Sequence, residues 1–259
     1  IAFAQIFDRY NIFHTHPVDS DTKMEITGAG NTIDGRLSLL SPLGINKYNR
    51  ELKIWIKDKE KKDMREIMER AGLDLNKPVI SLGVTSRKEV RVWPKERFAK
   101  LIDFLHEKYG VQAVLFYAPN DKKYNFEEDY CNEVRELVKN KEAVFTNLRT
   151  KSVRELIVLL SESDMYIGND NGPRHFAQAV DTPSFAIFTT LNNKKSFCPH
   201  NNPRHKAVDI QDVLKLSDEE YEEYTKKDEE YIRKTNDIPY EFVKDYIVNM
   251  IEKTRILEK

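Results

Sequence analysis

A polar turn at residues 167–175 carries residue types suited to binding an anion. The sequence Ile-Gly-Asn-Asp-Asn-Gly-Pro-Arg-His runs from an apolar strand into a tight turn, and a helix begins near Pro173. Unpaired backbone N–H groups and the positive end of the helix dipole point into such a turn, and Gly172 allows close approach to the backbone. This predicts a phosphate site in which Asp170 orders the turn or binds sugar hydroxyls. Simple helix capping by residues 169–171 is the alternative.

A second candidate segment, residues 83–94, follows an apolar run and ends in Trp-Pro at the start of a helix. It contains two hydroxyl side chains and three cations: Thr85, Ser86, Arg87, Lys88 and Arg91. Hydroxyl donors and guanidinium groups suit a diphosphate held between this loop and the turn at Asp170, although a charged surface loop is the alternative. Neither segment is a Walker A sequence or a GxGxxG motif, so ATP hydrolysis and dinucleotide redox chemistry lack their usual support.

Alternating apolar and amphipathic runs predict the type of fold to which both candidate segments belong. Apolar runs predict strands at residues 78–83, 111–117, 143–146, 165–168 and 183–188, and amphipathic runs predict helices at 94–109 and 127–139, after Ser152 and from Gly172. Strand, helix and strand at this spacing indicate right-handed βαβ units and a parallel sheet of the Rossmann-like kind. Ligands of such sheets bind beyond the carboxyl ends of the strands, where both candidate segments fall.

The remaining segments are predicted from composition. Residues 1–76 are less regular and include a charged helix at 58–71, residues 216–235 suit a solvated surface helix, and residues 241–253 form an amphipathic helix expected to pack on the body. The formal net charge is −1, which excludes a global basic field for nucleic acid. The apolar stretches are short, so we expect a cytosolic protein.

Histidine and cysteine usage does not indicate a metal or a disulfide framework. Only two cysteines are present, Cys131 and Cys198, and we expect both to be reduced and structural. His14 with His16, or Cys198 with His200 and His205, gives no convincing quartet of ligands, so we expect no metal and no cofactor.

Several ordered motifs together resemble glycosyltransferase family 9, the lipopolysaccharide heptosyltransferases. They are Trp93-Pro94, Leu156 to Leu160 before Ser163-Asp164, residues 168–175 followed by Ala177 and Ala179, and Thr182-Pro183. The family's D-S-G-P-x-H motif corresponds to residues 170–175. The resemblance covers residues 77–208, and residues 37–45 resemble the end of the family's first domain.

This resemblance implies a GT-B fold, with two Rossmann-like domains that have parallel sheets and face a cleft. Residues 1–76 would be an incomplete N-terminal domain on the acceptor side, and residues 77–235 the domain that binds the nucleotide sugar. Residues 236–259 would be a C-terminal helix packing on the body, against the N-terminal domain in one arrangement.

The resemblance also implies roles for single residues. Thr85 and Ser86 would contact the donor phosphates, and Arg91 would stand where the family has a lysine. Asp170 would bind the sugar or the diphosphate, with backbone N–H groups of Asn171 and Gly172 completing the cradle. Asp121 is a candidate for the ribose, and His175 is expected to fix the turn.

Four departures from the family concern the donor and the base. Thr189 replaces a glycine, the loop from Arg87 to Trp93 is one residue longer, and Arg91 replaces a lysine. The family's opening strand, glycine loop and aspartate have no match in residues 1–76, so we expect the general base to lie outside this chain. Asp8, Asp19, Asp21 and Asp34 are candidates by composition alone.

The resulting functional hypothesis is an inverting glycosyltransferase. It would move a heptose-like sugar from an ADP-heptose-like nucleoside-diphosphate donor to a lipopolysaccharide-core or related glycan acceptor, with peripheral contact at the inner face of the inner membrane. A noncatalytic nucleotide or nucleotide-sugar binding module is the alternative. Another GT-B enzyme, such as a sugar-nucleotide epimerase, fits the architecture but not the motif at residues 170–175.

Overall fold

The chain forms two compact units in the computed structural model. The structure describes residues 3–5, 16–18, 32–47, 49, 51–86, 91–117, 126–148, 150–188, 194–198, 202–225 and 238–258. The smaller unit comprises Ile1–Glu51 and Asn193–Asn201, and the larger one Leu52–Asn192 and Asn202–Lys259. Both candidate anion-binding segments belong to the larger unit.

The smaller unit contains one pair of short parallel strands among its described residues. Its elements are β1 (Phe3–Gln5), β2 (His16–Val18), α2 (Thr32–Leu37), the 3₁₀ helix η2 (Ser38–Leu43) and α8 (Lys194–Phe197). Phe3 lies opposite His16 in the β1–β2 pair. Gly44 ends η2 with a φ of 74°, a left-handed conformation that glycine adopts without a steric penalty.

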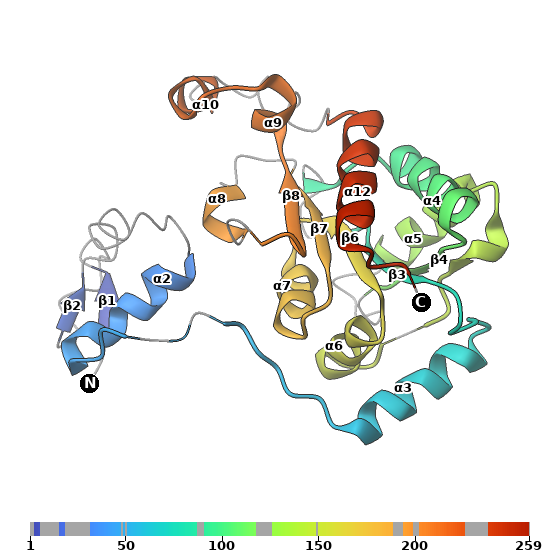
Figure 1. Ribbon diagram of the computed structural model, residues 1–259, viewed down its shortest axis with the longest axis horizontal. Coiled ribbons are helices and arrows are strands. Elements are labelled where there is room, and N and C mark those ends of the chain that lie inside the picture. Colours follow the sequence, from blue (N-terminus) through green and yellow to red (C-terminus); the bar gives the residue numbers. More distant parts are fainter. Residues whose placement is uncertain are drawn as a thin grey trace. The chain divides into compact units, whose positions relative to one another are not determined.

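The larger unit is built on a six-stranded parallel sheet (Figure 1). Its strands are β3 (Val79–Gly83), β4 (Gln112–Leu115), β5 (Val144–Phe145), β6 (Met165–Asn169), β7 (Ser184–Ile187) and β8 (His205–Val208). They pair in the order β5-β4-β3-β6-β7-β8, which is the Rossmann order with its reversal between β3 and β6. The predicted α/β fold with a parallel sheet is confirmed.

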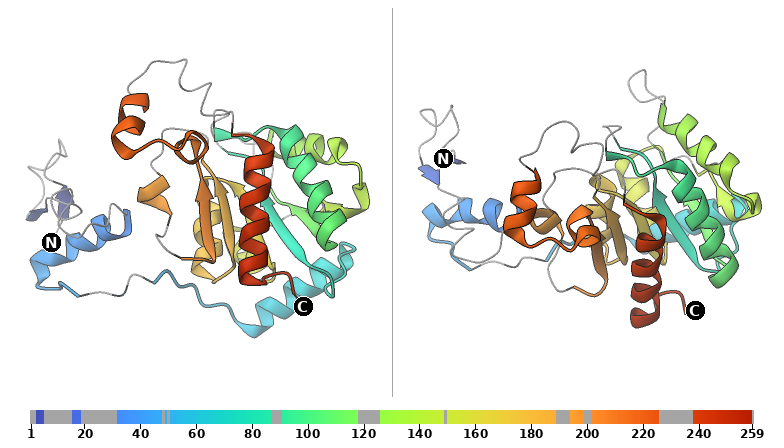
Figure 2. Two further views of the ribbon diagram at one scale, coloured as in Figure 1. Left: turned by 45° about the horizontal axis from the view of Figure 1, so that its top comes forward. Right: turned by 90° about the horizontal axis from the view of Figure 1, so that it is seen from above.

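Helices cover both faces of this sheet. They include α3 (Asp58–Arg70), α4 (Lys95–Tyr109), α5 (Phe126–Leu137), α6 (Val153–Ser161), α7 (Gly172–Ala179) and α12 (Tyr240–Thr254). Further helices of the larger unit are η4 (Lys141–Ala143), α9 (Ile210–Leu214) and α10 (Asp218–Thr225). Ile80 and Leu82 share one core with α4, α5 and α12, whereas Val79 shares the other with α3, α6 and α7. Figure 2 shows α12 (red) beside α4 (green), where Lys108 pairs with Glu252.

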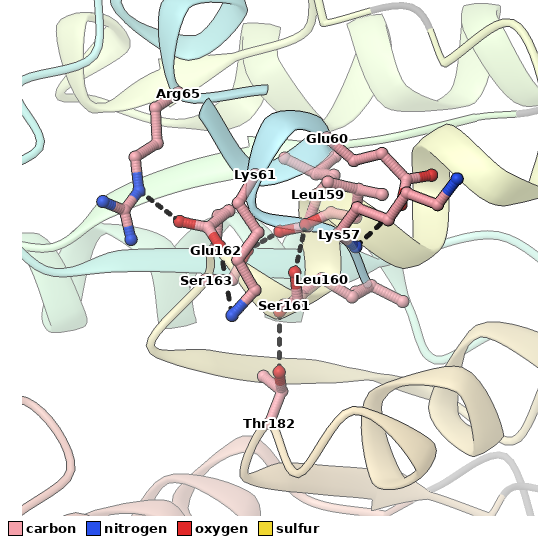
Figure 3. A network of polar contacts seen from close by, with 11 residues as sticks. Lys57, Glu60, Lys61, Arg65, Leu159, Leu160, Ser161, Glu162, Ser163 and Thr182 are labelled. Carbon is pink, nitrogen blue, oxygen red and sulfur yellow. Dashed lines mark hydrogen bonds and ion pairs between the residues drawn. The ribbon is translucent and has the colours of Figure 1, made fainter. Parts of the chain in front are cut away.

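Polar contacts hold α3 on α6 (Figure 3). The carboxylate of Glu162, which is only 5% exposed, lies between the cations of Arg65 and Lys61. Glu60 of α3 accepts two hydrogen bonds from the guanidinium of Arg154, at 2.8 and 2.7 Å. These contacts and the buried side chain of Met68 explain why residues 52–76, grouped above with the N-terminal segment, lie in the larger compact unit. The predicted division of the chain by role remains a prediction.

Strand β8 was not predicted from the sequence because its residues do not form an apolar run. Its burial is mixed, with His205 and Val208 buried and Lys206 exposed between them, as expected of a strand at the edge of a sheet. Its register is set by β7, with Ser184 opposite His205. The Oγ atom of Ser184 lies 3.0 Å from Nδ1 of His205, so the first residue of this strand is held by a buried polar contact.

His205 should make stability fall in mildly acidic solution. Burial lowers the pKa of its imidazole from 6.5 to about 4. Between pH 6.5 and pH 4 the unfolded chain binds a proton at this imidazole and the folded chain does not. The free energy of unfolding is therefore highest above pH 6.5 and decreases by about 3 kcal/mol toward pH 4. Urea unfolding at pH 7.5, 5.5 and 4.5 measures this decline.

The matched control for this prediction is His205→Asn, which removes the titrating group and keeps a polar side chain beside Ser184. Its stability should decline less than that of the unsubstituted chain over the same pH range. Parallel pH profiles for the two proteins would show that His205 does not contribute to the acid sensitivity.

Candidate functional site

Asn169 joins the two candidate segments at the point where the strand order reverses. The backbone N–H of Trp93 donates to its Oδ1 atom at 2.9 Å. Its Nδ2 atom donates to the backbone oxygens of Val84 at 2.9 Å and Gly83 at 3.3 Å. The side chain is completely buried at the end of β6. One amide therefore ties the end of β6 to both ends of the loop that follows β3.

Tyr166 and Asn171 form a second link between the segments. The hydroxyl of Tyr166 donates to Oδ1 of Asn171 at 2.8 Å, and Nδ2 of Asn171 donates to the backbone oxygen of Thr85 at 3.3 Å. Burial raises the pKa of Tyr166, which keeps this hydroxyl protonated and able to donate. A Cβ atom at Gly83 would lie 2.4 Å from this hydroxyl, so the close packing of β3 on β6 requires glycine there.

No described residue crowds the N-terminus of α7 at Gly172. The side chain of Asn171, its N-cap residue, makes no capping hydrogen bond because it is engaged with Tyr166 and Thr85. Pro173 stands in the first turn, where its missing N–H costs nothing. A Cβ atom on Gly172 would meet no atom within 4 Å among the described residues. The first N–H groups of this helix have no intrahelical acceptor, so the geometry suits an anion.

An ion pair lies beneath the turn. Nη2 of Arg174 is 3.4 Å from Oδ1 of Asp170 and donates to Nε2 of His175 at 3.1 Å, which assigns the proton of a neutral imidazole to Nδ1. The guanidinium carbon lies 5.5 Å from the ring centre of Phe188. The backbone N–H of Asp170 donates to the oxygen of Ile187 at 3.2 Å, which ties the main chain of the turn to the end of β7.

The structure brings most of the predicted site residues together. Thr85 and Ser86 follow β3 and are each 8% exposed. Asp170, Asn171, Gly172 and His175 form the β6–α7 turn. Arg91 is half-buried and precedes by two residues the tryptophan whose N–H is held by Asn169.

Some predicted residues lie outside the described part of the chain. They are Arg87, Lys88, Asp121, Thr189, His14, His200, Asp8, Asp19 and Asp21. Within the described ranges, no group of three or more histidine, cysteine or acidic side chains could hold a metal ion. Across those same ranges, no helix has both the length and the apolar character that crossing a bilayer requires. Cys131 and Cys198 are buried free thiols.

Three residues that shape the site were not singled out from the sequence. Asn169 was considered only as a capping residue, Tyr166 only as part of a strand, and Arg174 only as the variable position of a motif. An asparagine at the last buried position of a strand is the signal for the first, because a buried amide must find several partners. The sequence contains no comparable signal for the burial of Arg174.

The sequence is similar to a known protein family and to characterised relatives. The pattern of the family described as Glycosyltransferase family 9 (heptosyltransferase) matches residues 21–226. Lipopolysaccharide heptosyltransferase 3 of Escherichia coli is 30% identical over 161 residues, which cover 61% of this chain and 44% of that protein. Lipopolysaccharide heptosyltransferase 1 of Campylobacter coli is 32% identical over 122 residues, which cover 47% of this chain and 34% of that protein. The chain thus spans less than half the length of these relatives.

Solved structures with a similar fold belong to the same family. The family 9 glycosyltransferase of Veillonella parvula aligns with a TM-score of 0.69 and 20% identity, over 96% of this chain and 65% of that one. The E. coli ADP-heptose lipopolysaccharide heptosyltransferase II aligns with a TM-score of 0.57 and 16% identity, over 78% of this chain and 54% of that one. These similarities support the GT-B-like fold, and together with the family match over most of its length they show that the chain belongs to glycosyltransferase family 9, the heptosyltransferase family.

Proposed function

We propose that this protein is an inverting glycosyltransferase that moves a heptose-like sugar from a nucleoside-diphosphate donor to a lipopolysaccharide-core or related glycan acceptor. The observation that carries the proposal is the Asn169 link at the reversal of the strand order. It brings the hydroxyl-bearing loop after β3 next to the open N-terminus of α7, which is where Rossmann-like sheets bind nucleotides.

Each group of this cradle has a role in the proposed reaction. The helix N-terminus at Gly172 and the cation of Arg91 would stabilise the negative charge that develops on the leaving diphosphate. Thr85 and Ser86 would donate hydrogen bonds to phosphate oxygens, and Asp170 would accept them from sugar hydroxyls. A general base would remove the proton of the acceptor hydroxyl while the diphosphate leaves.

The family assignment supports the remaining parts of the proposal. The E. coli protein with the same fold is, by its description, an ADP-heptose transferase, which favours an ADP-heptose-like donor for this chain. In this proposal the donor is held by the unit that contains the six-stranded sheet, and the smaller unit belongs to the acceptor side. An acceptor of this class would bring the protein to the inner face of the inner membrane.

Nucleotide binding tests the donor site directly. We expect calorimetric titration of this chain with ADP, UDP, GDP, CMP and NAD to show selective binding of one nucleoside diphosphate. Arg91→Ala should weaken that binding about tenfold because it removes a cation near the phosphates. Arg135→Ala is the matched control, since Arg135 lies on α5 and pairs there with Glu136.

Two results of these titrations would contradict the proposed role of Arg91 or the proposed donor site. Loss of affinity in both arginine variants would mean that Arg91 acts through net charge, not through the site. Binding of NAD in preference to every nucleoside diphosphate would contradict a glycosyltransferase donor site. For the full reaction, the anomeric configuration of the product, determined by nuclear magnetic resonance, tests inversion.

A further inference from the structure

Arg174 is a buried cation, and two of its guanidinium nitrogens find no partner in the described part of the chain. It occupies the third position of α7 and is completely buried. Its Nη2 atom contacts Asp170 and His175, while the buried Nε and Nη1 atoms have no hydrogen-bond partner among the described residues. Burial of a charge is costly unless it is well paired, and each buried unsatisfied donor adds to that cost.

The position of Arg174 in its helix adds a further cost. The first turn of a helix carries partial positive charge, so a cation there is disfavoured relative to an anion. Asp170 offsets part of this charge, but its contact with Arg174 is long, at 3.4 Å, and its side chain is partly exposed whereas that of the arginine is buried. An anion arriving at the N-terminus of α7 would reduce the excess of positive charge.

The negative charge of Asp170 would repel an anionic ligand at the same turn. Its carboxylate sits in the turn where a diphosphate is proposed to bind, and two anions at close range repel each other strongly in a partly buried site. A cation fixed behind the turn removes this conflict. It neutralises the carboxylate from the side away from the ligand and extends positive potential toward the phosphates.

We propose that Arg174 is a positioning residue of the donor site that offsets the charge of Asp170 and so lets one turn hold a carboxylate and a diphosphate together. This inference rests on the proposed function. Arg174 acts through Asp170 and the electric field, not through direct contact, because its own nitrogens are buried. The ligand class it favours is a diphosphate in preference to a single phosphate group.

The test compares the binding of ADP with that of AMP. Inorganic pyrophosphate serves as a probe that has the two phosphates but no nucleoside. We expect Arg174→Gln to weaken ADP binding at least about tenfold and to reduce the ratio of ADP affinity to AMP affinity. Arg174→Lys, which keeps the charge, should retain more affinity than Arg174→Gln. The double variant Arg174→Gln/Asp170→Asn should bind ADP more tightly than Arg174→Gln alone, because both members of the pair are then neutral.

The restoration in the double variant distinguishes charge compensation from a structural role. Thermal unfolding of every variant establishes that the chain is folded before titration. Equal weakening of ADP and AMP, or a double variant that binds no better than Arg174→Gln, would overturn the inference. If the unsubstituted chain binds ADP and Arg174→Gln binds it equally well, this inference alone fails. If the unsubstituted chain binds neither ADP nor pyrophosphate, the proposed donor site fails and this inference fails with it.

Discussion

Replacing Asn169 with alanine is expected to abolish ADP binding and to lower the free energy of unfolding by about 3 kcal/mol. The substitution leaves the N–H of Trp93 and the backbone oxygens of Gly83 and Val84 without their buried partner. The loop after β3 would then separate from the β6–α7 turn, and a diphosphate could not contact both. Urea denaturation measures the stability, and calorimetric titration measures the binding.

Gln112→Ala is the matched control for this prediction. Gln112 is also a buried amide, and it also bridges two backbone groups, those of Asp74, at 2.8 and 2.7 Å. It is the first residue of β4, so it lies at the amino-terminal ends of the parallel strands, whereas Asn169 lies at a carboxyl end. Gln112→Ala should therefore reduce stability but retain ADP binding. If Asn169→Ala binds ADP as tightly as the unsubstituted chain does, the link between the two loops is not required for ADP binding.

Replacing Trp93 with alanine is expected to cost about 4 kcal/mol of stability, the largest loss that we predict for a single side chain. The indole is completely buried, packs edge-on against Phe98 with ring centres 5.0 Å apart, and donates from Nε1 to the backbone oxygen of Ile238 at 2.8 Å. It thus connects the loop that carries Arg91 to the segment before α12. ADP binding should weaken as well, because that loop loses its anchor.

The second tryptophan provides the control. Trp55 is 76% exposed and lies outside both apolar cores, so Trp55→Ala should change the free energy of unfolding by less than about 0.5 kcal/mol. Thermal or urea unfolding of the two variants measures the difference. Similar losses for the two variants would mean that Trp93 does not have the packing role described here.

The elements of the sheet were largely predictable because they bury both faces. Strand β3 is buried at all five positions, so it appears in the sequence as an uninterrupted apolar run. The helix predicted at residues 94–109 is α4, which follows Pro94 and ends at Gly110 with a φ of 68°. These elements depend on local periodicity and on proline and glycine at their ends.

Two features could not be predicted because they depend on distant partners. Strand β8 has only four residues, of which the first and the last are buried, and this is too short a signal without its neighbour β7. The position of α3 follows from its ion pairs with α6, between residues that are 94 and 97 positions apart in the chain. Composition alone describes α3 as a charged helix and does not say what it packs against.

The sequence was sufficient to identify the turn at residues 168–175, its chemical character and its family, because these depend on residue types in a fixed order. It was not sufficient to show that Asn169 joins segments 76 positions apart in the chain, or that Arg174 is buried behind Asp170. Both depend on the pairing of β3 with β6 and on the way α7 packs against the sheet. The partners of a buried polar group are set by which strands are neighbours, and that is established only when the whole sheet has formed.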